Sequence, residues 1–275
     1  TWTHPGIGYL RKQHCHFGWD WGPTLVTCGI WRNIGIEAFD AARIEDVQIL
    51  QDHSKKGAVT LTVNVGANAD APAALAARVT VARCGQPAAA SADVKLEQGR
   101  GSATLPVPNP ELWWPNGMGA QPLYAVEVRL LDGAGGPALD TASRRIGLRK
   151  MQALSKTDSA PMQFVVNDVP FFAKGGNWIP ADSFPTRVPP ATLRRYVEDA
   201  VAVNMNSLRF WGGGYYEDDA LFDACDELGI VVWLDFKFSC TTYPSFDPAF
   251  LASVREEARD NVRRLRHHPS IGVWC

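Results

Sequence analysis

Four short apolar segments in the second half of the chain each end in tryptophan or charged side chains. A guanidinium and a carboxylate bind polar ligands through charge-assisted hydrogen bonds, and tryptophan packs its flat face on the C–H faces of sugars or on other rings. If the segments are neighbouring strands, these side chains meet at one edge and predict a polar pocket with aromatic walls. In chain order they are Asn177, Trp178, Arg209, Trp211, Asp235 and Trp274.

The same residues also have purely structural interpretations. Arg209 and Asp235 are of opposite charge and can form an ion pair that only holds two strand ends together. Trp178 and Trp211 can be ordinary packing between loops. The sequence leaves both interpretations open.

Three other motifs give weaker indications. Gly212–Gly214 lacks the spacing of a phosphate-binding loop, so a tight turn that lets a ligand approach the backbone is favoured. His14 and His16 would share one face of a strand, but no third metal ligand is evident and the cysteines lack zinc-site spacing, so we predict no metal. His267-His268 at a predicted helix end is interpreted as complementing the helix dipole.

Helices separate the four apolar segments. Strand–helix alternation at this spacing indicates a parallel sheet with right-handed crossovers, which fits a doubly wound sheet or a (β/α)8 barrel. A complete barrel needs about 250 residues, so the order of elements favours the first half of one. The helical stripes cover 193–201, 221–228 and 251–265, and the strands that follow them are 207–211, 230–236 and 271–275.

Alternating apolar residues dominate the first half of the chain. Residues 41–152 contain about seven such segments separated by Gly, Pro, Asn and Asp, which indicates an immunoglobulin-like β-sandwich. Residues 164–172 predict a hairpin with an Asn167-Asp168 turn. Residues 24–26 and 30–36 predict two short strands, and because so few strands form no domain alone, we expect a larger β-domain before Thr1.

Composition excludes several classes of protein. The 275 residues carry a formal net charge of -2, which gives no support for nucleic-acid binding. The longest apolar run, Ile230–Leu234, is far shorter than the about 20 residues of a membrane-spanning helix. No basic and apolar leader follows Thr1, and the compartment and oligomeric state are left open.

Several motifs together resemble the β-mannosidases of glycoside hydrolase family 2. The stretch from Phe17 to Pro23 reads Phe-Gly-Trp-Asp-Trp-Gly-Pro, which separates mannosidases from the galactosidases and glucuronidases of that family. The remaining motifs are 29–31, 113–119, 174–182, 209–214 and 268–271.

The resemblance implies a multidomain β plus α/β architecture. Residues 1–40 would be the tail of a jelly-roll sugar-binding domain, 41–152 the immunoglobulin-like sandwich, and 153–275 the N-terminal half of a (β/α)8 catalytic barrel. It implies release of terminal β-mannose with retention and without a cofactor. The residues it implies in substrate binding are Trp19, Asp20, Asn177, Trp178, Arg209, Trp211 and Asp235.

Retaining glycosidases need two carboxylates about 5–5.5 Å apart. The resemblance implies an acid/base glutamate shortly after Cys275 and a nucleophile later still, so we expect the 275-residue chain alone to be inactive. Gly176 and Lys237 depart from the family pattern, and Lys237 puts the leaving-group preference in question. The alternatives are an exo-β-glucosaminidase-like enzyme, a non-catalytic carbohydrate-binding remnant and a structural interaction protein.

Overall fold

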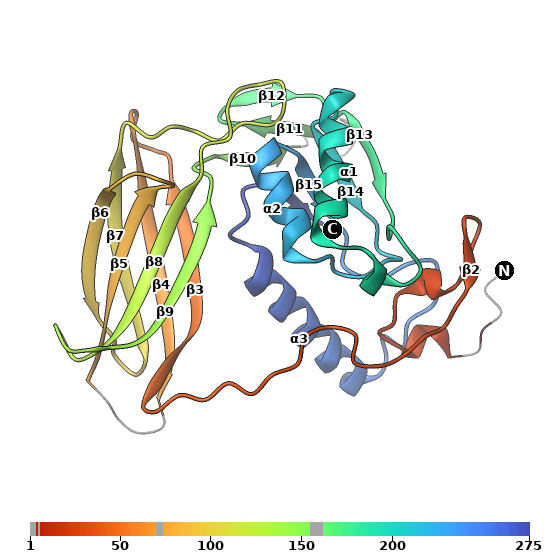
Figure 1. Ribbon diagram of the computed structural model, residues 1–275, viewed down its shortest axis with the longest axis horizontal. Helices are drawn as coiled ribbons and strands as arrows, with labels where there is room; N and C mark the ends of the chain where they lie inside the picture. Colours follow the sequence, from red (N-terminus) through yellow and green to blue (C-terminus); the bar gives the residue numbers. More distant parts are fainter. Residues whose placement is uncertain (1–3, 5, 70–73, 155–161) are drawn as a thin grey trace.

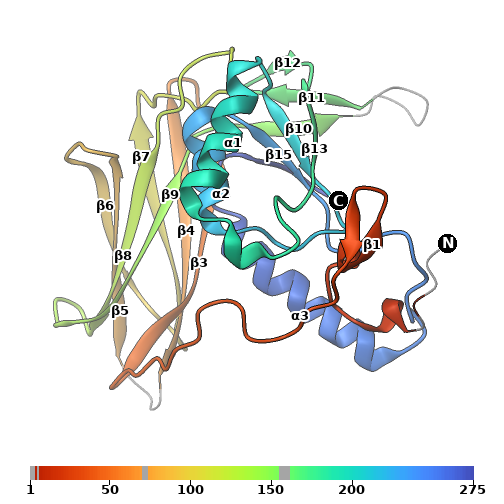
Figure 2. The same ribbon diagram turned by 45° about the vertical axis from the view of Figure 1, so that its right-hand side comes forward.

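The computed structural model describes residues 4, 6–69, 74–154 and 162–275. A β-sandwich stands beside an α/β unit, and the N-terminal segment lies on the side of that unit away from the sandwich (Figures 1 and 2). A long irregular connection, residues 25–41, returns from this segment to the sandwich. In the described part of the chain, no helix has the length and apolarity needed to cross a membrane.

The sandwich consists of two antiparallel sheets, ordered β3-β4-β7 and β6-β5-β8-β9. Val59, Leu61, Val63 and Val65 of β4 are buried in its core, while the polar residues between them are not. The described residues of this region form seven strands, in agreement with the about seven predicted. They are β3 (Ala42–Asp52), β4 (Ala58–Ala69), β5 (Leu75–Arg83), β6 (Ala88–Lys95), β7 (Arg100–Pro108), β8 (Tyr124–Asp132) and β9 (Ala138–Ile146).

A small antiparallel sheet follows, formed by β10 (Met151–Leu154), β11 (Gln163–Val166) and β12 (Val169–Phe171). Asn167 and Asp168 join β11 to β12 with positive φ at both positions, which a tight two-residue hairpin turn requires. The hairpin predicted with this turn is confirmed.

The α/β unit has four parallel strands in chain order, β13-β14-β15-β16. The predicted parallel arrangement is confirmed. The strands are β13 (Gly175–Trp178), β14 (Ser207–Phe210), β15 (Val231–Leu234) and β16 (Ile271–Trp274). The connections contain the short 3-10 helix η3 (Pro185–Arg187) and helices α1 (Pro190–Ala202), α2 (Asp219–Leu228) and α3 (Pro248–Leu265).

Local sequence fixes the ends of these helices. The Asp247 side chain accepts a hydrogen bond from the Ala249 backbone N–H at 2.9 Å and caps α3. Gly229 ends α2 with φ 77°, a conformation that suits a residue without a Cβ. The predicted apolar stripe of α3 is only partly covered: Leu265 is buried, but Leu251 is 42% exposed. An amphipathic pattern sets which face can pack, whereas the neighbouring elements decide how much of it does.

The two faces of the parallel sheet have different surroundings. Leu208, Phe210, Val232 and Leu234 pack in the core that includes α1 and α2. Because side chains alternate along a strand, Arg209 points to the opposite face of β14. Polar side chains at the strand ends are therefore directed away from the helices.

The N-terminal segment contains η1 (Ile7–Tyr9), η2 (His14–His16), β1 (Phe17–Trp19) and β2 (Gly22–Thr24). The strand predicted at 30–36 is wrong, because this part is irregular and Ile36 is fully exposed. The strand predicted at 24–26 is β2, shifted towards the N-terminus. Apolar alternation forms a strand only where a neighbouring strand can take up the backbone hydrogen bonds.

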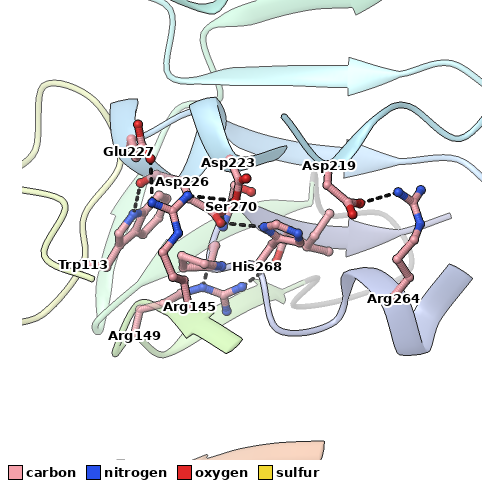
Figure 3. A network of polar contacts seen from close by, with 12 residues as sticks. Trp113, Arg145, Arg149, Asp219, Asp223, Asp226, Glu227, Arg264, His268 and Ser270 are labelled. Carbon is pink, nitrogen blue, oxygen red and sulfur yellow. Dashed lines mark hydrogen bonds and ion pairs between the residues drawn. The ribbon is translucent and has the colours of Figure 1, made fainter. Parts of the chain in front are cut away.

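A buried polar network joins the sandwich side to the α/β unit (Figure 3). The indole N–H of Trp113, between β7 and β8, donates to the Asp226 carbonyl oxygen at 2.8 Å. The Asp226 carboxylate accepts from His268 Nδ1 at 2.6 Å and from the Ser270 backbone N–H at 3.0 Å. Asp226 and Ser270 are completely buried, so these hydrogen bonds replace the water that both groups lose on folding.

Candidate functional site

Arg209 and Asp235 form a two-point ion pair where β14 and β15 end. Arg209 Nη2 lies 2.7 Å from Asp235 Oδ2, and Arg209 Nε lies 3.2 Å from Oδ1. The Gly212 backbone N–H also donates to Oδ2 at 3.1 Å. The Asp235 side chain is 9% exposed and that of Arg209 is 43% exposed. The pair is thus anchored at its carboxylate and leaves part of the guanidinium open to a ligand.

Three tryptophans gather beside this ion pair. The rings of Trp19 and Trp211 meet edge to face with centroids 4.5 Å apart. Trp21 approaches Trp211 in a similar way at 6.0 Å. Trp19 and Trp21 come from β1 and the β1–β2 turn, whereas Trp211 follows β14. The structure therefore brings together tryptophans that lie almost 200 positions apart in the sequence.

Two polar residues flank these groups. Asn177 of β13 is aligned with Arg209 of β14 in the parallel register, so both lie at one level of the sheet. Asp20 occupies the β1–β2 turn between Trp19 and Trp21 and is exposed. Because Asp20 is exposed, its carboxylate is accessible to hydroxyl groups of a ligand.

Trp178 lies on the other side of the sheet from Arg209. Its ring packs against Tyr196 of α1 and Phe210, each with a centroid distance of 5.9 Å. Its indole N–H donates to Glu217 Oε1 at 2.8 Å. The expected place of this ring in the pocket is therefore wrong, because strand alternation turns it towards the helices.

Gly212–Gly214 form a turn whose glycines are closely surrounded by other atoms of the protein. A Cβ on Gly212 would overlap the Phe238 carbonyl oxygen, and a Cβ on Gly213 would overlap the indole ring of Trp211. The expectation that these glycines let a ligand approach the backbone is corrected, because neighbouring protein atoms already occupy the space. Their small size instead allows the Trp211 ring to fold over the turn.

Burial strongly shifts the pKa values of two charged side chains behind the turn that carries Trp211. Burial raises the pKa of Glu217, and hydrogen bonds from Trp178 and Tyr215 offset part of this effect. Burial lowers the pKa of Lys237 to about 8, although nearby Glu217 and Asp235 favour its charged form. The Lys237 ammonium donates to the Trp211 carbonyl oxygen at 3.2 Å.

The histidines considered as metal ligands have protein partners. His14 and His16 lie in a 3-10 turn rather than on a strand. His14 Nδ1 bonds to the Ser239 carbonyl oxygen at 2.7 Å, and its ring stacks on Tyr243. The strand interpretation is therefore wrong.

The predicted dipole role of His267-His268 is also wrong. His268 is buried and bonds to Asp226. Burial, reinforced by His268 and nearby arginines, lowers the pKa of His267 to about 3. A neutral imidazole cannot complement the negative end of a helix dipole.

One cluster of described residues has the composition of a metal site. Ligand atoms of Asp223, Asp226 and His268 lie within 4.8 Å of one another. Asp223 Oδ1 accepts from Arg145 Nη2 at 2.8 Å, and both oxygens of Asp226 already accept hydrogen bonds. These bonds satisfy the carboxylates without an ion and favour a structural role for the cluster (Figure 3).

Comparisons with known proteins identify relatives along the whole chain. The family described as "Glycosyl hydrolases family 2" matches residues 42–149, and the family described as "Glycosyl hydrolase 2 galactose-binding domain-like" matches residues 1–32. "Beta-mannosidase B" of Thermothelomyces thermophilus is 40% identical over 97% of this chain and 31% of that protein. The chain belongs to glycosyl hydrolase family 2.

Other family 2 members agree with this assignment. The β-mannosidase of Rattus norvegicus is 36% identical over 98% of this chain and 31% of its own length. The crystal structure of the β-D-mannosidase from Dictyoglomus thermophilum superposes with a TM-score of 0.88 and 37% identity, over 96% of this chain and 33% of that one. The chain thus spans about a third of the length of these three β-mannosidases.

Sequence reasoning on this family 2 chain missed two contributors to the site. Trp21 contacts Trp211, and its place beside Trp19 in a Gly-punctuated loop was a usable signal. Glu217 is 2% exposed, but nothing in its local sequence distinguishes it from a solvated glutamate. Its burial depends on Trp178 and Tyr215, which only the tertiary structure brings around it.

Proposed function

We propose that this chain is part of an exo-acting, retaining β-mannosidase that releases terminal non-reducing β-D-mannose from oligosaccharides or glycoconjugates. The observation that carries the proposal is that β-mannosidases match nearly the full chain, while its own tryptophans and the Arg209–Asp235 pair form a polar site with aromatic walls. Such walls and hydrogen-bonding groups suit a sugar.

Each side chain has a role in this proposal. Trp19 and Trp211 form the walls that contact the C–H faces of the mannose ring. The exposed part of the Arg209 guanidinium donates to a sugar hydroxyl, and Asp235 fixes its orientation. Asp20 accepts hydrogen bonds from sugar hydroxyls as a charged acceptor. Asn177, level with Arg209, adds an amide that can donate and accept.

We propose for the domains a jelly-roll tail at 1–40, an immunoglobulin-like sandwich at 41–152 and the first half of a (β/α)8 barrel at 153–275. The two-sheet sandwich and the parallel order of β13 to β16 support this division. In a barrel, sites lie at the C-terminal ends of the strands, where Arg209 and Asp235 are found.

The chemistry in this proposal is double displacement by two carboxylates, with no cofactor. By family resemblance, the acid/base and nucleophile glutamates follow Cys275 in the sequence. The residues described here therefore bind and orient the sugar. The 275-residue chain alone should not hydrolyse a β-mannoside.

The test is a panel of aryl β-mannoside, β-glucosaminide, β-galactoside and β-glucuronide substrates, assayed on the full-length protein and on the 275-residue chain. We expect the full-length protein to prefer the mannoside and the short chain to show only the rate of a buffer blank. Preference for the glucosaminide would replace the proposed substrate. Turnover by the short chain that Arg209→Ala abolishes would contradict the assignment of the catalytic groups.

A further inference from the structure

A second pocket lies behind the turn that carries Trp211. It is an open pocket with a volume of about 250 Å³, lined by residues of the N-terminal segment, of the loops after β14 and β15, and of α3. We call it the Lys237 pocket. Its charged lining residues are Arg11, Lys12, Arg32, Lys237 and Glu257.

The positive charges of this pocket exceed the negative ones. Glu257 is its single acidic lining residue, and its carboxylate is held by Arg11 Nε at 2.8 Å and Nη2 at 2.7 Å. Three cationic side chains remain. Lys12, Arg32 and Lys237 form no ion pair with any described carboxylate.

The contacts of these three side chains leave donors available. Lys237 Nζ donates to the Trp211 carbonyl oxygen at 3.2 Å and lies 5.1 Å from the centroid of the Tyr216 ring. Arg32 donates to the Tyr216 carbonyl oxygen and stacks over Trp31. The direct contacts of Lys237 and Arg32 are therefore backbone oxygens and aromatic faces, which compensate a charge less well than an anion in contact does.

Three carboxylates, those of Glu217, Asp235 and Glu257, act electrostatically on Lys237, but none of them forms an ion pair with it. Asp235 binds Arg209 and the Gly212 N–H. Glu217 Oε1 accepts from Trp178, whereas its buried Oε2 has no hydrogen-bond partner among the described residues. Glu217, Asp235 and Glu257 favour the charged form of Lys237, but burial outweighs them and lowers its pKa to about 8. An ammonium held in this way gains from a counter-ion that enters the pocket.

We propose that the Lys237 pocket binds a small oxyanion of the phosphate, sulfate or carboxylate class through Lys237, Lys12 and Arg32. The Trp211 carbonyl that Lys237 contacts belongs to the residue that walls the candidate sugar site. The anion can thus be a free ion or an acidic substituent on a bound glycan, and both present the same oxygens to the pocket.

The test is calorimetric titration of the protein with inorganic phosphate at low ionic strength. We expect saturable one-to-one binding that is about tenfold weaker in Lys237→Gln and in Lys12→Gln, because each loses one charge-assisted contact. Lys56→Gln is the matched control, since Lys56 is exposed on the β3–β4 connection of the sandwich. Its affinity should equal that of the wild type.

Absence of saturable binding, or equal affinity in Lys237→Gln and Lys12→Gln, would overturn the proposal. Thermal melts establish that each variant is folded. If Lys237→Gln does not fold, Lys12→Gln decides the question, because Lys12 is only half-buried and forms no ion pair with a described residue.

A sulfate titration provides an independent readout, because sulfate keeps its charge across neutral and basic pH. We expect sulfate affinity to fall as pH rises through about 8, where Lys237 loses its proton. Lys237→Gln should lose this pH dependence. A wild-type profile identical to that of Lys237→Gln would contradict the role of Lys237.

A comparison of mannose 6-phosphate with inorganic phosphate separates the two sources of the anion. This arm alone rests on the proposed sugar site. Tighter binding of the sugar phosphate that Trp19→Ala weakens would assign a glycan substituent. Equal affinity for both probes would assign a free ion. The phosphate titration itself does not depend on mannosidase activity, so it can succeed or fail separately from the proposed function.

Discussion

The Asp235 carboxylate holds the Arg209 guanidinium at two points, 2.7 and 3.2 Å, and its Oδ2 also accepts the Gly212 N–H. This third hydrogen bond ties the end of β15 to the turn that follows Trp211. The same buried carboxylate therefore orients both the cation and the aromatic wall of the candidate site. A change at Asp235 should affect binding through both.

Asp235→Asn tests this relationship. The amide keeps the size of the side chain but loses the charge that fixes Arg209. We expect kcat/KM for aryl β-mannosides in the full-length protein to fall about tenfold or more, which corresponds to ~1.4 kcal/mol. Asp93→Asn is the matched control, because Asp93 forms an exposed ion pair with Arg78 on the sandwich. A loss of kcat/KM of the same size in Asp93→Asn would contradict a specific role for Asp235.

Trp19→Ala tests the aromatic wall. The substitution removes the edge-to-face contact with Trp211 and one surface for the sugar. We expect KM for the mannoside to rise about fivefold, the equivalent of ~1 kcal/mol, with a smaller change in kcat. Phe246→Ala, at a ring that is 79% exposed, should leave both constants unchanged. An unchanged KM in Trp19→Ala would place the sugar elsewhere.

Two adjacent glycines in β13 should respond in opposite ways to alanine. A Cβ on Gly175 would overlap the Ser207 carbonyl oxygen, whereas a Cβ on Gly176 meets nothing within 4 Å. We expect Gly175→Ala to destabilise the protein by about 3 kcal/mol and Gly176→Ala to stabilise it by up to about 1 kcal/mol. Thermal unfolding of the two variants measures the difference, and similar melting temperatures would contradict the strand packing.

The low pKa of His267 predicts that the stability of the protein depends on pH. Its pKa is about 3 in the folded chain, below the about 6.5 of an exposed histidine. The unfolded chain therefore takes up a proton below pH about 6.5 that the folded chain does not, and stability falls as pH falls. His267 contributes at most about 1.4 kcal/mol per pH unit to this slope. His267→Gln should flatten the curve of unfolding free energy between pH 6.5 and 5, and an unaltered slope would disprove the assignment.

The sequence by itself determined the sandwich strands, the hairpin turn and the helix ends, because each depends on residues that are close together in the chain. Apolar alternation in β4 and the Asn167-Asp168 turn predicted a sandwich strand and a hairpin correctly. Asp247 and Gly229 marked two helix ends because their capping depends on residues nearby in the chain. The family motifs were also readable, since they are continuous stretches of sequence.

Only the tertiary structure decided which side chains meet. The family motifs implied that Trp19 and Trp211 share a site, but the edge-to-face contact itself arises because the N-terminal segment docks on the loops after β14 and β15. Trp178 faces the helices and Glu217 is buried beneath it, which depends on strand register and on neighbours that are distant in sequence. Local chemistry is set by nearby residues, whereas burial and charge balance arise when distant segments exclude water together.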